Sequence, residues 1–221
     1  MSMTTKFRGV TFAYPGQKPV FRDLVLDLPA DKTVLLNGEN GTGKTTLASL
    51  AAGLLHPQEG RIHYEYQGLP YPHKGEIYKH ISLLKQDAEH NLLGVNPLDD
   101  LLLWLLSSDD KVYESDLRIV RSLSDWNLSD KKHTPLWELS SGELKCLALA
   151  GISLHKSRFW ILDEPLSSLD ERHVQLLLKI IQAKRKASPG MLIISHRSDL
   201  FEELSDKVIT LTEKGIMESE R

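Results

Sequence analysis

Three short apolar runs, at residues 33–36, 159–162 and 191–194, are the most regular hydrophobic feature of the chain. Runs without polar alternation are typical of parallel strands that helices cover on both faces. Apolar residues recur at helical spacing over residues 47–55, 98–106, 112–123, 144–151 and 172–186. This alternation of strands and helices predicts an α/β fold with a mainly parallel sheet.

The region before the first apolar run has a two-residue periodicity. Over residues 7–14 two sets of positions alternate, Phe7, Gly9, Thr11 and Ala13 against Val10, Phe12 and Tyr14. A turn signal, Tyr14-Pro15-Gly16, follows them. Residues 7–28 therefore predict an N-terminal antiparallel β meander, with Phe7 and Val10 on opposite faces of its first strand.

Composition narrows the class of protein. The 221 residues suit one large domain, or one domain with an insertion, and the net charge of −3 gives no global basic field for nucleic acid. Cys146 is the only cysteine, so no intrachain disulfide can form, and we expect it to be an ordinary small apolar residue in a reducing compartment.

No apolar run approaches the roughly 20 residues that cross a bilayer as a helix. The N-terminus also lacks the apolar core of a secretory signal, so any membrane role should come through a partner.

A glycine-rich loop directly follows the first predicted strand. Gly38, Gly43, Lys44 and Thr45 fit the pattern Gly-x-x-x-x-Gly-Lys-[Ser/Thr], and a helical pattern comes next. Glycines allow successive backbone N–H groups to point at phosphate oxygens, and the positive end of the following helix favours the same anions. The loop therefore predicts a site for a nucleoside triphosphate.

The other two buried strands end in residues that suit this chemistry. Asp163-Glu164 follows residues 159–162, and Ser195-His196 follows residues 191–194. In open α/β sheets, ligands bind at the carboxyl ends of the strands, so all three strands should deliver their residues to one edge. A strand that simply reaches solvent would also end in polar residues. Mg²⁺ on a triphosphate would supply the counter-ion that Asp163 needs, and would leave Glu164 placed to polarise a water.

A further motif, Leu139-Ser140-Ser141-Gly142-Glu143, precedes the helical pattern over 144–151. With this motif the chain resembles the ATP-binding subunits of ABC transporters, whose signature Leu-Ser-Gly-Gly-Gln lies shortly before an Asp-Glu strand. The resemblance covers almost the whole chain in the family's order. It includes Gln86 after the strand 81–84, a D-loop at residues 167–170, and His196 at the place of the switch histidine.

The resemblance implies a role for each site residue, with ATP and Mg²⁺ as cofactors. Tyr14 would stack on the adenine, Glu164 would be the general base, and His196 and Lys44 would act on the γ-phosphate. Thr45, Gln86 and Asp163 would arrange Mg²⁺, directly or through water. The phosphates would be held by a continuous set of residues, Asn40, Gly41, Thr42, Gly43, Lys44, Thr45 and Thr46.

Ser140 and Gly142 have a different implied role. In the family these residues cap the γ-phosphate bound by a second ATPase subunit, so two chains, identical or paralogous, would enclose two ATP molecules in a C2 or pseudo-C2 dimer. The chain departs from the signature at Ser141 and Glu143, and its Lys145-Cys146 replaces a common Gln-Arg pair. We expect Glu143 to face solvent rather than the triphosphate.

The resemblance also implies a domain organisation and a location. It predicts one ABC ATPase domain over residues 1–221, with a RecA-like core at about 1–86 and 151–221 and a helical subdomain at about 87–150. The apolar run at 101–106 would form either the core of this subdomain or a groove for a helix of an integral membrane permease. The protein would then lie in the cytoplasm on the inner face of the cell membrane.

The function implied is ATP hydrolysis that energises transport through a separate permease, in a subgroup that resembles vitamin and cobalt importers. One alternative is an ABC ATPase that acts on nucleic acid or ribosomes. Such proteins usually carry two ATPase halves or long coiled coils, and neither pattern is present in this sequence. A small-molecule kinase with the same phosphate loop is a second alternative, which residues 139–143 argue against.

Overall fold

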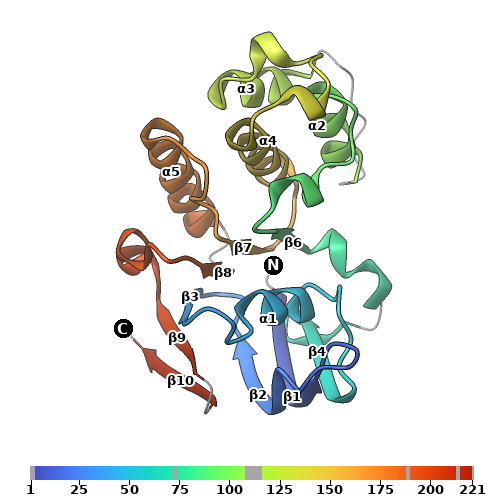
Figure 1. The fold of residues 1–221 in the computed structure, drawn as a ribbon, viewed down its shortest axis with the longest axis vertical. Coiled ribbons are helices and arrows are strands. Elements are labelled where there is room, and N and C mark those ends of the chain that lie inside the picture. Colours follow the sequence, from blue (N-terminus) through green and yellow to red (C-terminus); the bar gives the residue numbers. More distant parts are fainter. Residues whose placement is uncertain (1–2, 72–73, 108–115, 188–189, 213–214, 221) are drawn as a thin grey trace.

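The structure, a computed structural model, describes residues 3–71, 74–107, 116–187, 190–212 and 215–220, and its strands form two sheets (Figure 1). The first sheet is antiparallel, in the order β2-β1-β4-β5. Its strands are β1 (Met3–Phe12), β2 (Phe21–Leu28), β4 (Glu59–Tyr66) and β5 (Leu69–Pro70). The predicted N-terminal antiparallel region is therefore confirmed, with β4 and β5 added from later in the chain.

The second sheet has the order β10-β9-β3-β8-β7-β6, and every neighbouring pair in it is parallel except β9 and β10. Its strands are β3 (Thr33–Gly38), β6 (Ile81–Leu84), β7 (Phe159–Asp163), β8 (Met191–Ile194), β9 (Lys207–Thr212) and β10 (Gly215–Glu220). The three apolar runs are thus β3, β7 and β8, which lie side by side at its centre. This confirms the predicted α/β fold with a mainly parallel sheet.

The predicted alternation in β1 is wrong in one respect. Phe7 and Val10 are both fully buried. In a regular strand, two residues three positions apart would lie on opposite faces. The register with both neighbouring strands shifts between them, at Gly9, whose φ of 62° lies in the left-handed region. A bulge at this glycine turns the second half of the strand over, so both side chains face the core.

Five α-helices accompany the sheets in the described residues. They are α1 (Lys44–Ala51), α2 (Pro97–Leu106), α3 (Leu117–Asp125), α4 (Ser141–Leu154) and α5 (Glu171–Ala187). The predicted helices near 98–106, 144–151 and 172–186 are confirmed. The start of the helix predicted over 112–123 falls partly on residues 108–115, which lie outside the described residues.

The core has two parts. One lies between the two sheets and contains α1, which contributes Leu47, Leu50 and Ala51. The other joins α2, α3, α4 and α5 to the opposite face of the parallel sheet. Trp160 and Cys146 belong to this second part, and burial raises the pKa of the Cys146 thiol to about 12, so it packs as a small apolar residue as expected.

The helices α2, α3 and α4 group together at the top of Figure 1, away from the antiparallel sheet. The described residues of the predicted helical subdomain, at about 87–150, contain α2, α3 and most of α4. α4 continues to Leu154 and leads directly toward β7. The division into a RecA-like core and a helical subdomain at about 87–150 remains a prediction.

Gly151 gives a direct test of how α4 packs on α2. A Cβ atom at this position would lie 2.2 Å from Nε1 of Trp104 in α2. We expect Gly151→Ala to lower the free energy of unfolding by about 1–2 kcal/mol, because overpacking outweighs the better helix propensity of alanine. Urea unfolding measures this cost, and it should shrink when Trp104→Leu is added. An equal cost in both backgrounds would contradict the packing described.

Candidate nucleotide-binding site

The carboxyl ends of β3, β7 and β8 meet at one edge of the parallel sheet, beside a cavity of about 520 Å³. The structure places there every predicted site residue except Thr42, Ser140 and Gly142. The lining consists of Tyr14, Gln17, Val20, Asn40, Gly41, Gly43, Lys44, Thr45, Thr46, Gln86, Asp163, Glu164 and His196. Residues up to 182 positions apart in sequence are thereby collected in one place, which fits the expectation from the strand ends.

The glycine-rich loop has the backbone that an anion site requires. Gly41 and Gly43 have φ angles of 82° and 98°, which side chains rarely tolerate. A Cβ atom at Gly43 would also lie 2.5 Å from Cγ1 of Val20. The Lys44 ammonium donates hydrogen bonds to the carbonyls of Gly38 (2.7 Å) and Glu39 (2.8 Å), so it lies across the loop. The first turn of α1 and this charge face the same cavity.

Among residues 40–46, Thr42 alone does not line this cavity. Its hydroxyl donates a hydrogen bond to the carbonyl of Glu39 (2.9 Å), within the loop itself. It borders a neighbouring hollow beside Val20 and Leu211 instead. Its side chain therefore supports the shape of the loop.

Asp163 is the most constrained group of the site. Its residue is 2 % exposed, and its Oδ2 atom has no hydrogen-bond partner among the described residues. Burial raises the pKa of this carboxyl, while a hydrogen bond from Thr45 and the charges of Lys145, Lys44 and His196 lower it. A carboxylate with a free buried oxygen beside a threonine hydroxyl is the donor set that a Mg²⁺ ion on a triphosphate uses. The residues present therefore fit this ion.

Glu164 is held by contacts with the end of β8. Its backbone N–H donates to the carbonyl of Ile194 (2.9 Å), and its carboxylate accepts the backbone N–H of His196 at 3.0 and 3.3 Å. Its φ of 47° is unusual for a residue with a side chain, and such strained residues concentrate at functional sites. The His196 Nε2 atom lies 3.5 Å from its carboxylate. The strand ends therefore fix the direction in which this carboxylate points.

Tyr14 forms another part of the lining, beside the first turn of α1. Its hydroxyl is 3.2 Å from Oγ1 of Thr46, and its ring meets the ring of Phe12 edge to face. The structure adds Gln17 and Val20 to the lining. Sequence reasoning missed both, because the turn signal at residues 14–16 does not show which cavity the residues after it will line. The turn is closed by a hydrogen bond from Gln17 N to Tyr14 O.

Lys145 is a further residue that sequence reasoning missed. It is buried in α4, and its ammonium donates to the carbonyl of Gln86 at 2.8 Å. Burial lowers the pKa of Lys145 to about 8, against the opposing influence of Asp163, Asp87 and Glu164. Its only signal in the sequence is the departure from the family's Gln-Arg pair.

The signature residues lie outside the cavity, at the start of α4. Ser140 caps the helix, because its hydroxyl accepts the N–H of Glu143 (3.3 Å). A Cβ atom on Gly142 would lie 2.8 Å from the carbonyl oxygen of Ser168, so only glycine lets the start of the helix pack so closely on Ser168.

The expectation that Glu143 faces solvent is incomplete, because its side chain is only 28% exposed and has partners within its own chain. Its carboxylate accepts the N–H of Ser140 (2.9 Å), completing a capping box, and it pairs with the ammonium of Lys131 at 2.5 Å. The hydrogen bond from Lys131 is the main cause that lowers the pKa of Glu143, so the group is ionised at neutral pH. A glutamate at this position therefore has a local structural partner.

None of the helices in the described part of the chain is long and apolar enough to cross a membrane.

Comparison with known proteins gives the family. The family model "ABC transporter" matches residues 21–167. An ABC transporter ATP-binding protein of Nostoc sp. is 30% identical over 208 residues, which cover 93% of this chain and 76% of that protein. The cobalt import ATP-binding protein CbiO of Rhodobacter capsulatus is 28% identical over 201 residues, covering 90% and 72%.

Among solved structures, a dimeric ATP-binding cassette in a post-hydrolysis state, bound to ADP and Pi, superimposes with a TM-score of 0.82. It is 16% identical, over 98% of both chains, so this likeness concerns the fold. The matching family model, the relatives and the nucleotide cavity agree: the chain belongs to the ABC transporter family, as an ATP-binding subunit whose ATP hydrolysis energises transport.

Proposed function

We propose that the chain hydrolyses Mg²⁺-bound ATP in the cavity at the ends of β3, β7 and β8, in a dimer, and thereby drives import through a separate membrane permease. The observation that carries this proposal is the convergence of the glycine-rich loop, Asp163, Glu164 and His196 on one cavity. When bound, Mg²⁺ would neutralise phosphate charge, held by Thr45, Asp163 and Gln86.

Different residues of the cavity would bind the adenine, bind the phosphates and accept the proton of the attacking water. Tyr14 offers a ring for the adenine, and the loop from Asn40 to Thr46 offers N–H groups and the Lys44 charge for the phosphates. Glu164 takes the proton of the attacking water on a carboxylate oxygen that the N–H of His196 orients. His196, whose side chain is 60% exposed, is free to donate to the γ-phosphate.

The dimer follows from the position of the signature. Ser140 and Gly142 do not line their own chain's cavity, and they begin a 14-residue helix whose positive end favours an anion. A second subunit could bring its triphosphate to this helix end. The resemblance to the family and the dimeric solved relative support this arrangement.

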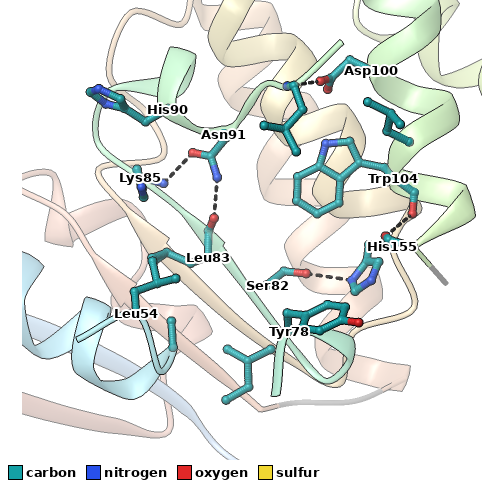
Figure 2. A pocket seen from close by; sticks show the side chains of 15 residues that line it. Leu54, Tyr78, Ser82, Leu83, Lys85, His90, Asn91, Asp100, Trp104 and His155 are labelled. Atoms are coloured by element: carbon teal, nitrogen blue, oxygen red, sulfur yellow. Dashed lines mark hydrogen bonds between the residues drawn. The ribbon is translucent and has the colours of Figure 1, made fainter. Parts of the chain in front are cut away.

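A groove of about 380 Å³ on the helical side offers a docking place for the permease (Figure 2). Its exposed apolar rim includes Leu54, Tyr78, Leu93 and Leu103. At its floor, His155 faces Trp104 in Figure 2, and burial lowers the pKa of His155 to about 4, so this ring is uncharged at neutral pH. An apolar groove of this shape suits a short amphipathic helix.

One short segment of the chain borders both the groove and the nucleotide cavity. Leu83 and Lys85 line the groove, and Gln86, the next residue, lines the cavity. Asn91 fixes this segment, since its side chain donates to the Leu83 carbonyl (2.6 Å) and accepts the Lys85 N–H (2.8 Å), as Figure 2 shows. A permease helix bound in the groove would therefore contact the same segment that carries Gln86, and a shift of this helix would move Gln86 relative to the ATP.

The run at 101–106 takes part in both the core and the groove. Leu101 and Leu105 are buried in the core, while Leu103 and Trp104 line the groove. Through such a partner the chain would lie in the cytoplasm at the inner face of the membrane. The similarity to a cobalt import protein supports import, and the residues of the described chain give no preference for a cargo.

Glu164→Gln tests the general base. We expect it to keep ATP affinity and to lower kcat by about 10²–10⁴, because the amide cannot accept the proton of the attacking water. It should also accumulate an ATP-dependent dimer. Phosphate release and light scattering measure the two effects, with Glu171→Gln on α5 as the matched control. Unimpaired hydrolysis by the Glu164→Gln variant would remove Glu164 from this role.

Leu103→Asp tests the groove. The new charge should lower recovery of an integral membrane protein with the tagged chain, on the order of tenfold, because it must be desolvated on docking. ATP binding should stay unchanged. Quantitative recovery from detergent-solubilised native membranes measures this, and Val25→Asp, another exposed apolar position, is the control. Equal loss in both variants, or recovery of ribosomes or nucleic acid in place of a membrane protein, would contradict the proposal.

A further inference from the structure

A charged side chain is buried between the signature helix and the nucleotide cavity. Lys145, in the second turn of α4, is 2 % exposed and is one of the largest fully buried side chains described. Its ammonium donates to the carbonyl of Gln86 at 2.8 Å and lies 3.4 Å from the carbonyl of Lys85. A helix residue from one part of the fold thus holds the backbone of a residue that lines the cavity.

Stability does not explain this lysine. Removing an ammonium from water is costly, and a methionine of similar length at a buried position is often neutral or more stable. The carboxylates of Asp163, Asp87 and Glu164 favour the charge and so recover part of the cost. Lys44 and His196 also lower the pKa of the same Asp163. The charge of Lys145 therefore belongs to the network of the nucleotide cavity.

The segment that Lys145 contacts directly follows β6, which is paired with β7 over residues 81–84. Asn91 holds Leu83 and Lys85 from the side of the groove. On the other side, a cavity of about 190 Å³ borders Gln86 and Asp87, and Lys145 lies at its edge with Ser141 and Ser168. The hydrogen bond from the Lys145 ammonium to the Gln86 carbonyl thus holds a residue that lines this smaller cavity.

We infer that Lys145 is a positioning residue, which fixes the backbone of Gln86 so that its side chain amide reaches the metal end of the nucleotide cavity. The same bond couples Gln86 to α4, whose first turn carries Ser140 and Gly142. Any shift of this helix would then also displace the backbone of Gln86. The inference rests on the proposed hydrolysis of Mg²⁺-bound ATP at this site.

Lys145→Met removes the bond and keeps the length of the side chain. We expect kcat for ATP to fall roughly tenfold, the loss expected for one hydrogen bond from a charged group, with KM for ATP changed less than about twofold. The melting temperature should not fall. Amide hydrogen exchange of residues 85–87 should become faster, because the Gln86 backbone loses its anchor, and this readout does not depend on turnover.

Lys184→Met is the matched control. Lys184 in α5 is also an ammonium that donates to a backbone carbonyl, that of Ser157 (2.6 Å), and burial lowers its pKa to about 8 as well. It does not line the nucleotide cavity. We expect this variant to keep the wild-type kcat. An equal loss of kcat in both variants would show a general effect of losing a buried lysine and would overturn the inference.

A double-mutant cycle with Gln86→Ala shows whether Lys145 acts through Gln86. In the Gln86→Ala background, Lys145→Met should lower kcat by less than about twofold, because the group it positions is gone. Lys145→Arg should restore most of the activity, since the adjoining cavity has room for the larger donor. Additive losses in the cycle would overturn the inference. Should the Met variant fold poorly, Lys145→Gln carries the same comparison.

The outcomes separate this inference from the proposed function. If the wild-type chain or its dimer hydrolyses no ATP, or if Glu164→Gln turns over at the wild-type rate, the proposed function fails whatever Lys145 does. If Glu164→Gln is inactive and Lys145→Met matches the wild type in kcat and in hydrogen exchange, the inference alone fails.

Discussion

Asp163 ends a strand that is buried along its whole length, and its carboxylate has almost no contact with solvent. β7 is paired on both edges, by β6 and β8, and the two parts of the core cover its faces. A carboxylate at its end must find positive charge or hydrogen-bond donors nearby, since an unpaired buried charge is very costly. Lys44, Lys145 and Thr45 are groups that this fold brings within reach.

The same constraint explains why the site gathers distant parts of the chain. Parallel strands end at one edge of the sheet, so the loop after β3 and the residues after β8 necessarily lie beside Asp163. Glu164 then has to leave the strand in a strained conformation, with its carboxylate fixed by the N–H of His196. The rigidity of the central strands is therefore transferred to the groups that would perform the chemistry.

The sequence predicted the central strands, the loop and most of the cavity, because each depends on local pattern or on the rule that parallel strands share an edge. The bulge at Gly9 could not be predicted, since alternation carries no mark of where the register shifts. Gln17 and Lys145 were missed for another reason. A turn signal does not show which cavity Gln17 will line. The departure from the family pattern at Lys145 does not show that its ammonium will contact a residue far along the chain.

The first turn of α4 shows how local contacts accommodate a departure from the family pattern. In the proposed dimer, Glu143 would place a negative charge near the triphosphate of a second subunit, and this alone would oppose binding. The charge is already paired with Lys131, and the N–H of Glu143 is already taken by the Ser140 hydroxyl. The N–H groups of Ser141 and Gly142, which have no partner within a helix, remain the donors of this end. An anion would therefore meet a helix terminus whose local charge is balanced, which is the condition for binding it there.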